Sequence, residues 1–399
     1  MRPPATQRAL RRHNLGTVLE HVVRRGPRSR ATIAQETGFN KSTVSSLVTE
    51  LIELGMLAER GAERTGTVGR PGLVVEVAGA GAAGIGIEVN VDYLSVRVVD
   101  LAGEVIHRAH EILDLRNREA GEMLDRLAGV ARAALDALRE ANVRPAGITV
   151  ALPGIVDAAS GTLLVAPNLH WEDVPVADEL ARRLGPGAPP ISADNDANLA
   201  ALAELRSGAG QGLRDFVHVT GEIGIGAGVV LGGELFRGAH GYGGEFGHLT
   251  VEPNGQPCAC GSVGCLETRA GLEALLRAAG EAEAGGTPAG PVERLAARAD
   301  AGDEQARAAL AEGGRWLGVA LASAANLLDP QAFILCGFFA PLAEHLRPAA
   351  EAELRLRVLG AQRGLPAVLT SSLGPDAAVC GAAGEVLERV LADPAAVLD

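Results

Sequence analysis

The feature that most constrains the fold of this 399-residue chain is a short loop with three cysteines, preceded ten residues upstream by a histidine. Three thiolates and an imidazole form a ligand set that zinc binds tetrahedrally, and two glycines within the loop would let it turn around an ion. Four protein ligands leave no position for water, so the pattern predicts a structural zinc site on His248, Cys258, Cys260 and Cys265. Three buried free cysteines are the alternative, but clustered cysteines in a chain of this kind are more often metal ligands.

Two glutamates are attached to this loop. Glu267 lies two residues after Cys265, and Glu245 lies three residues before His248. A bound zinc would hold both carboxylates near one cavity, and the second ring nitrogen of His248 could face a ligand there. Such converging polar groups suit a polyhydroxylated ligand. Each glutamate alone could also be an ordinary solvated surface charge.

A third polar group follows an expected strand over residues 191–193. Asn195 and Asp196 come at the carboxyl end of this strand and begin a helix. In that position they could bind hydroxyl groups, and Asp196 could act as a general base on one of them. Asn and Asp are also common helix caps, so this motif alone leaves both interpretations open.

The first part of the chain has the pattern of a winged helix-turn-helix. Apolar residues at helical spacing predict helices over residues 10–24 and 41–54, and Ser29 can cap a short helix between them over residues 30–37. Expected strands at 56–60 and 73–77 flank a glycine-rich loop and would form the wing. A plain bundle of three helices is the alternative. The DNA contacts predicted on the third helix and the wing are Lys41, Ser42, Thr43, Ser45, Ser46 and Arg70.

Charge favours the DNA-binding interpretation. The whole chain has a formal net charge of −13, but residues 1–72 carry +6 and the remainder carries −19. Arg2, Arg8, Arg11 and Arg12 form a basic arm that suits phosphate contact, and cations also suit the minor groove. A basic head therefore precedes an acidic body.

The body reads as α/β. Three β-like runs at residues 82–110 precede a long amphipathic helix at 120–141, and further strands and helices alternate up to a final helix that begins near Ala377. The N-terminus shows no secretory signal. The uncharged apolar stretch over residues 316–328 has 13 residues, against roughly 20 for a membrane span. We therefore expect a cytoplasmic protein without a membrane partner.

These motifs together resemble the signatures of the ROK family (repressors, open reading frames, sugar kinases), and the N-terminal head makes the chain similar to that family's transcriptional regulators. The resemblance implies an actin-like (ribonuclease H-like) body of two α/β lobes with zinc on the His/Cys set. It implies sugar contacts at Asn195, Asp196, Glu245, His248 and Glu267. The expected domains are a head over 1–78, a first lobe over 79–195 completed by 376–399, and a second lobe over 196–375.

Departures from the family pattern separate regulator from kinase. Family kinases carry an Asp-x-Gly-Gly-Thr-Lys turn, whereas residues 88–93 here read Glu-Val-Asn-Val-Asp-Tyr. A turn without glycine cannot bring backbone N–H groups close to phosphate, and added carboxylates repel it. The second phosphate loop contains Glu222, and the adenosine-side glycine cluster is reduced to Gly337 before Phe338. We therefore expect no enzyme activity, with Asp196 at the position of the kinase base.

The first hypothesis is a sugar-responsive transcriptional regulator, most often a repressor in such proteins, acting as a homodimer or homotetramer on a pseudo-palindromic double-stranded operator. The alternatives are a sugar kinase that also binds DNA and a regulator whose signal is a protein partner. The sequence does not identify the sugar. Trp171 could stack on a sugar or fill the core.

Overall fold

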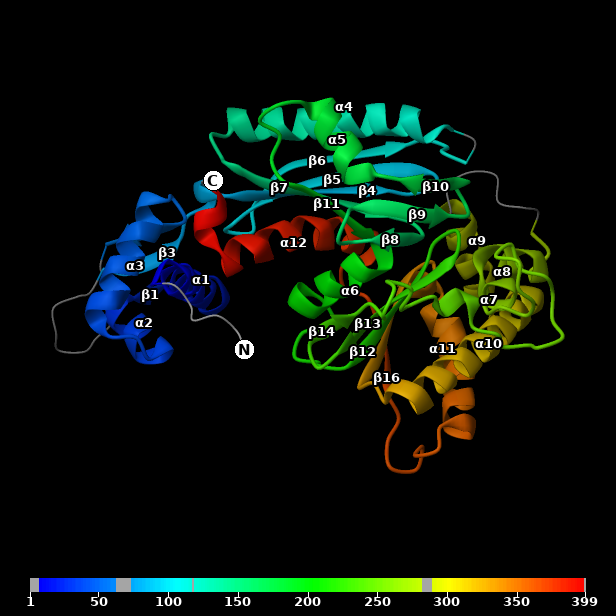
Figure 1. Ribbon diagram of the computed structural model, residues 1–399. Helices are drawn as coiled ribbons and strands as arrows, with labels where there is room; N and C mark the ends of the chain where they lie inside the picture. The colour runs from blue at the N-terminus through cyan, green and yellow to red at the C-terminus, as the bar shows by residue number, and fades with distance from the viewer. Residues whose placement is uncertain (1–6, 62–72, 117, 282–288, 398–399) are drawn as a thin grey trace.

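The computed structural model describes residues 7–61, 73–116, 118–281 and 289–397 (Figure 1). Its N-terminal head contains α1 (Gln7–Arg25), α2 (Arg30–Thr37) and α3 (Lys41–Glu53). The hydroxyl of Ser29 accepts a hydrogen bond from the Thr32 N–H at 3.1 Å and caps α2. Beside the helices lies a sheet of order β1-β3-β2, made of β1 (Arg28–Ser29), β2 (Leu57–Arg60) and β3 (Val74–Val77). The head is therefore a winged helix-turn-helix, as predicted.

The first lobe is built on a five-stranded sheet of order β11-β7-β4-β5-β6. The antiparallel meander β4-β5-β6 was expected, and β7 and β11 extend it in parallel. Helix α4 (Ala120–Glu140) covers one face, and α12 (Ala377–Ala392) covers the other (Figure 1). The strands are β4 (Ala83–Val89), β5 (Tyr93–Asp100), β6 (Val105–Ile112), β7 (Pro145–Leu152) and β11 (Ile191–Asn195).

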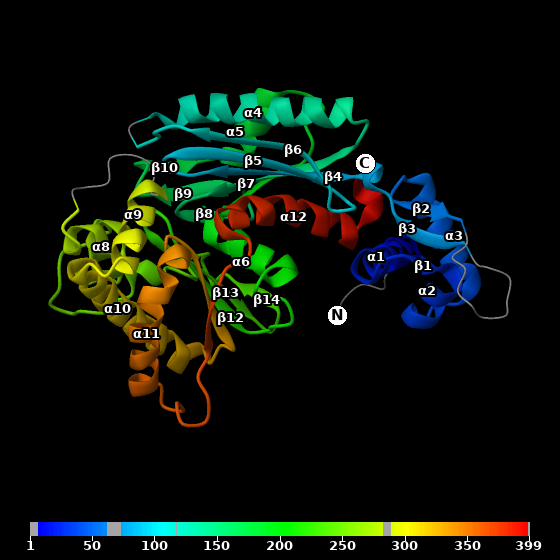
Figure 2. The ribbon, with the colours of Figure 1, turned by 180° about the vertical axis from the view of Figure 1, so that it is seen from behind.

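The second lobe has a five-stranded sheet of order β14-β13-β12-β15-β16. Helices α10 (Glu304–Leu328) and α11 (Phe339–Arg357) pack against each other beside it, and α6 (Asp196–Ser207) lies with α12 between the two sheets (Figures 1 and 2). This two-lobed arrangement confirms the predicted fold class. The strands are β12 (Phe216–Gly221), β13 (Ile225–Leu231), β14 (Glu234–Phe236), β15 (Ala332–Gly337) and β16 (Ala367–Thr370).

Some elements were not predicted. A three-stranded sheet of order β10-β9-β8 packs beside the first lobe, and within it Trp171 is 4% exposed and donates its indole N–H to the Arg118 carbonyl at 2.8 Å. Trp171 therefore fills the core. The unpredicted helices and strands are β1, α11, β16, β8 (Ile155–Asp157), β9 (Thr162–Ala166), β10 (Trp171–Val174), α5 (Val176–Leu184), α7 (Glu267–Ala270) and α9 (Ala289–Asp300).

The head packs on the C-terminal end of α12. Leu15 and Leu19 of α1 share a buried cluster with Leu391 of α12. Arg12 donates to the Asp393 carboxylate at 2.8 Å, so this arginine, expected in the DNA-binding arm, lies at the contact between head and body. A Cβ at Gly16 would lie 2.6 Å from the Leu391 carbonyl oxygen, which shows how closely the two backbones approach.

Within the described ranges, no helix is both long and apolar enough to cross a membrane.

Candidate functional site

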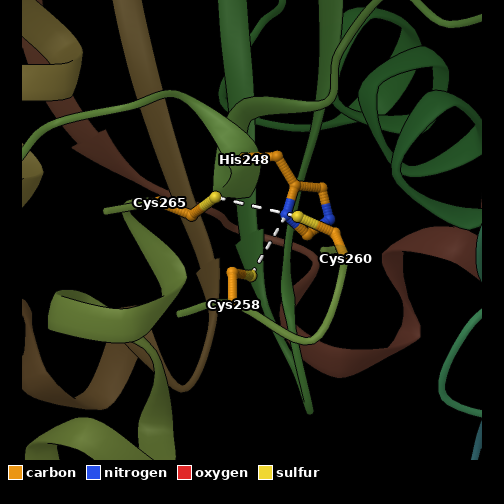
Figure 3. Close-up of side chains that lie close together, drawn as sticks. All are labelled: His248, Cys258, Cys260 and Cys265. Carbon is orange, nitrogen blue, oxygen red and sulfur yellow. Dashed lines mark hydrogen bonds between the residues drawn. The ribbon is translucent and has the colours of Figure 1, made fainter. Parts of the chain in front are cut away.

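The four expected metal ligands lie together. The ligand atoms of His248, Cys258, Cys260 and Cys265 are all within 4.8 Å of one another (Figure 3). His248 Nδ1 is 3.8 Å from the Cys258 sulfur, and the sulfurs of Cys260 and Cys265 are 3.8 Å apart. This spacing fits a single tetrahedral ion, since Zn–S and Zn–N bonds of about 2.3 and 2.1 Å place neighbouring ligand atoms about 3.5 to 4 Å apart.

The backbone holds the cysteine loop in this shape. The Cys258 N–H donates to the Ser262 carbonyl at 2.8 Å, and an isolated β-bridge joins Thr250 to Cys265. Gly264 has a φ of 73°, and a Cβ there would lie 1.7 Å from the Glu252 carbonyl oxygen. The glycine just before Cys265 therefore permits a close approach that no other residue allows.

The electrostatics of the cluster also suit a cation. Burial raises the pKa of the Cys258 and Cys265 thiols above the usual value. A bound cation would reverse that effect, because a metal stabilises the thiolate form directly. The cluster therefore has the donor types and spacing of a zinc site.

Both glutamates belong to segments that contact β13. Glu267 is the first residue of α7, and its Oε2 accepts a hydrogen bond from the Ile225 N–H at 2.9 Å. Glu245 is more exposed, with Oε2 at 3.9 Å from His248 Nε2. His248 thus directs Nδ1 toward the cysteines and Nε2 toward Glu245, which is the division of roles that the sequence suggested.

Asn195 and Asp196 stand at the start of α6. Asn195 caps the helix by accepting from the Asn198 N–H at 3.0 Å, while its side-chain amide donates to the Gly154 carbonyl at 2.9 Å. Asn195 can therefore cap α6 and also belong to the candidate site, so the two interpretations of this motif do not exclude each other. Burial, with repulsion from Glu245, raises the pKa of Asp196 to about 6. Asp196 of the strand-end motif and Glu245 of the zinc-loop motif therefore lie near enough for their charges to interact.

Two residues at this site were not predicted from the sequence. Arg237 pairs with both carboxylate oxygens of Asp194. The side-chain nitrogen of Asn168 lies 3.8 Å from where a Cβ on Gly224 would be, and Glu267 Oε2 lies 2.5 Å from the same point. Neither residue belongs to a motif with characteristic spacing, which is why the pattern of the sequence did not indicate them.

The predicted DNA contacts in the described chain lie on one helix. Lys41, Ser42, Ser45 and Ser46 are exposed and Thr43 is partly exposed at the N-terminal half of α3, while Arg70 lies outside the described residues. Arg30 donates to Ser45 Oγ at 3.0 Å, and Arg11 donates to Ser46 Oγ at 3.2 Å. Each of these arginines also pairs with a carboxylate, Arg11 with Glu50 and Arg30 with Glu59, and Arg30 was not anticipated.

Comparison with known proteins decides the family. The model of the ROK family matches residues 84–388, and that of the MarR family matches residues 16–67. The chain belongs to the ROK family. Its body, with the zinc-type loop and the inter-lobe polar site, is a ROK domain, and its head is similar to MarR-type DNA-binding domains.

Similarity extends over nearly the whole chain in ROK regulators. The xylose repressor of Bacillus spizizenii is 30% identical over 97% of this chain and 98% of its own length. A solved ROK family transcriptional regulator, described as a homologue of the E. coli MLC protein, is 26% identical with a TM-score of 0.81, covering 98% of both chains. A ROK family glucokinase from Streptomyces griseus, solved with glucose and AMPPNP, is 30% identical with a TM-score of 0.64, and covers 76% of this chain and 98% of the glucokinase.

Proposed function

We propose that this chain is a sugar-responsive transcriptional regulator, most simply a repressor of genes for carbohydrate uptake or metabolism, acting in the cytoplasm. The observation that carries the proposal is the full-length similarity to a xylose repressor, head and body together. The glucokinase similarity, in contrast, covers 76% of the chain. The proposed division is a DNA-binding head over 1–78 and two lobes over 79–195 with 376–399, and 196–375.

In this proposal α3 enters the major groove of operator DNA. Lys41 and Ser42 would contact phosphates and base edges from the first turn of the helix, where recognition helices make most of their base contacts. Arg11 and Arg30, beside Ser46 and Ser45, would reach phosphate by exchanging their partners Glu50 and Glu59 for it. A symmetric homodimer or tetramer would place two heads on a pseudo-palindromic site.

The body would bind a sugar between its lobes and zinc beside it. Asn195 and Asp196 would meet the sugar from the first lobe, and Glu245, His248 and Glu267 from the second. Zinc held by His248, Cys258, Cys260 and Cys265 would act structurally, by fixing the imidazole and the segment that leads into Glu267.

We further propose that the body is not a kinase. A Cβ on Gly221 would lie 2.5 Å from the Phe338 ring. An aromatic side chain therefore packs against the loop that would hold phosphate. Glu222 follows in the same loop, and Glu88 and Asp92 add carboxylates opposite it. Without a bound phosphoryl donor, Asp196 would hydrogen-bond a sugar hydroxyl, and no phosphoryl transfer would follow.

The signal would pass through α12. Its first residues, Ala377 and Ala378, lie beside Asp196 in one cavity wall, and its last turn packs on α1 of the head. A sugar that binds one arrangement of the lobes more tightly would shift the position of α12, and with it the heads. The shift cannot exceed the difference in sugar affinity between the two arrangements.

The test begins with selection of an operator from a random duplex library, followed by fluorescence anisotropy with a panel of monosaccharides and disaccharides. We expect tight binding to a palindromic site that one sugar weakens at least several-fold. A coupled ATP assay on the same sugars should show no turnover. Turnover at ordinary kinase rates would favour a kinase that binds DNA, and indifference of DNA binding to every sugar would favour a protein signal.

A further inference from the structure

Three serines share one exposed face of α3. Ser42, Ser45 and Ser46 lie three and four residues apart, so their side chains are neighbours on the helix surface. A serine hydroxyl has one proton to donate and lone pairs with which to accept, and a free serine can therefore pair with either kind of group on DNA. Hydrogen bonds within the head remove that freedom from these three serines, and they do so in opposite directions.

The proton of Ser42 is already used. Ser42 Oγ lies 2.7 Å from Oδ1 of Asn40, the N-cap residue of α3. The same Oδ1 accepts from the Thr43 backbone N–H at 2.7 Å. A backbone N–H can only donate, so this contact identifies the atom as the amide oxygen, and an amide oxygen can only accept. Ser42 therefore donates to Asn40 and presents only lone pairs to DNA.

Ser45 and Ser46 have the opposite polarity. Arg30 Nη1 donates to Ser45 Oγ at 3.0 Å, and Arg11 Nη2 donates to Ser46 Oγ at 3.2 Å. A guanidinium group has no acceptor, so both serine oxygens must accept. Neither hydroxyl proton has an acceptor among the residues that the structure describes. Ser45 and Ser46 therefore each present a proton to DNA.

Arg30 is held to α3 by more than the Ser45 hydroxyl. Its Nη1 also donates to the Ser45 carbonyl at 2.7 Å and to Thr49 Oγ1 at 3.1 Å, while its Nε pairs with Glu59 of β2 at 2.9 Å. A phosphate could therefore replace Glu59 on the Nε side and leave the bond to Ser45 Oγ in place. Thr49 has no proton left for a base, because its hydroxyl donates to the Ser45 carbonyl at 2.8 Å.

We propose that this polarity sets what α3 recognises on DNA: Ser42 accepts from an exocyclic amino group, and Ser45 and Ser46 donate to acceptors. In the major groove the amino groups are adenine N6 and cytosine N4, and the acceptors are purine N7, guanine O6 and thymine O4. Phosphate oxygens only accept, so Ser45 and Ser46 can bind the DNA backbone, whereas Ser42 has no proton for it. Ser42 is therefore the serine that contacts a base. This selection rests on the proposed DNA binding and specifies which groups of the operator it uses.

Double-mutant cycles between the full-length, zinc-loaded protein and its selected operator provide the test, with anisotropy as the measure of affinity. Ser42→Ala, Ser45→Ala and Ser46→Ala should each weaken binding about threefold to tenfold, the equivalent of one hydrogen bond. Operators in which one adenine or cytosine analogue lacks the amino group should, at one position, abolish the effect of Ser42→Ala alone. Operators that lack one acceptor should abolish the effect of Ser45→Ala or Ser46→Ala alone. The acceptors removed are purine N7, guanine O6, thymine O4 and, by methylphosphonate, a phosphate oxygen.

Asn40 gives a second readout. Asn40→Asp retains an accepting oxygen, so the preference of Ser42 for an amino group should remain even though the added charge weakens binding to every duplex. Asn40→Gly costs the helix cap only a few tenths of a kcal/mol but frees the Ser42 proton, so this preference should relax. Ser323→Ala is the matched control and should leave every affinity unchanged, since Ser323 is an exposed serine of α10 whose hydroxyl donates to the Val319 carbonyl at 3.0 Å.

Three results would overturn the proposed polarity. The first is that the effect of Ser42→Ala disappears on removal of an acceptor. The second is that the effect of Ser45→Ala or Ser46→Ala disappears on removal of an amino group. The third is that no alanine variant couples to any analogue. A parent protein that selects no operator from the library would instead refute the proposed function itself.

Discussion

Arg237 donates from its two terminal guanidinium nitrogens to the two carboxylate oxygens of Asp194, at 2.6 Å each. Asp194 lies on β11 of the first lobe, and Arg237 directly follows β14 of the second, so the ion pair joins the lobes. Asp194 also precedes Asn195 and Asp196, and thus the pair fixes the relative position of the lobes at the edge of the candidate sugar site.

Replacement of Arg237 by alanine should lower the free energy of unfolding by about 2 kcal/mol, because a nearly buried carboxylate loses its charged donors. The expected loss is smaller than for a fully buried ion pair, because the Arg237 side chain is 37% exposed and solvent screens its charge. Arg237→Lys should recover only part of the loss, because lysine cannot make the two-pronged contact. Urea unfolding measures both. Arg182→Ala, which breaks an exposed pair with Glu179, should cost less than about 1 kcal/mol, and equal effects of the two alanine variants would contradict the role of the inter-lobe pair.

The metal cluster yields a second prediction. Elemental analysis should find one zinc per chain, and Cys265→Ser should lose it, because the remaining ligands no longer close the tetrahedron. Sugar affinity should fall with the zinc, since Glu267 follows Cys265 by two residues and its hydrogen bond to the Ile225 N–H depends on the position of the loop. Cys380→Ser, outside the cluster, should keep both properties. A Cys265→Ser protein with full sugar affinity would separate the metal from the sugar site.

Local spacing explains what the sequence could predict. The helices of the head follow from apolar residues at helical intervals and from caps such as Ser29, and the structure has α2 at the expected residues. The His/Cys cluster was predictable because its members are close in sequence and only a few ligand chemistries use such a set. The meander β4-β5-β6 was also visible, as short turns separate its β-like runs.

Contacts between segments that are far apart in the sequence could not be predicted from the spacing of residues along the chain. The pair Arg237–Asp194 joins residues 43 positions apart, and the Arg12–Asp393 contact joins residues 381 positions apart. Arg12 looked like part of a DNA-binding arm because its charge was visible and its partner was not. The sheet β10-β9-β8 was missed because its strands are three to five residues long, too short for a clear alternation of apolar and polar residues.

Lys41 should contribute to DNA binding through charge. Lys41→Ala should weaken binding to operator and to unrelated duplexes by similar factors and should reduce the slope of log K against log salt by about one. Anisotropy titrations over a salt series measure this slope. Arg139→Ala removes an equal charge from the exposed surface of α4 and should leave the slope unchanged. A normal salt slope in Lys41→Ala would mean that this lysine does not reach a phosphate.

Substitution of Gly16 tests whether α12 transmits the sugar signal from the body to the head. A methyl group there would lie 2.6 and 2.8 Å from the Leu391 and Ala392 carbonyl oxygens, so Gly16→Ala should push α1 away from α12 at a cost of about 1 to 3 kcal/mol. If the proposed function holds, the variant should still bind the operator but respond several-fold less to the sugar. The ratio of DNA affinities with and without sugar measures the coupling. Gly121→Ala on α4, where a Cβ has no heavy atom within 4 Å, is the control, and an unchanged ratio in Gly16→Ala would place the coupling elsewhere.

The burial of His218 leads to a prediction about how the free energy of unfolding depends on pH. It lies fully buried in β12, neither ring nitrogen has a hydrogen-bond partner in the described structure, and burial lowers its pKa to about 4. In the unfolded chain the pKa of a histidine is about 6.5, so between these values the unfolded state binds more protons than the folded state. The contribution of His218 to stability should therefore be complete above pH 6.5 and fall by roughly 3 kcal/mol as the pH drops toward 4.

The comparison that isolates this effect is between the parent and His218→Leu. This variant replaces the imidazole by an apolar side chain of similar size and so removes the titrating group. Urea unfolding at several pH values should give a difference in stability between the two that grows in favour of the variant only below about pH 6.5. All carboxylates and the His/Cys cluster are common to both proteins, so their titrations cancel in the difference. His240→Leu, an exposed histidine, should follow the parent at every pH. A neutral buried imidazole must take up a proton on unfolding, which is why the two profiles should diverge. Parallel profiles for the parent and His218→Leu would show that His218 does not contribute to acid unfolding.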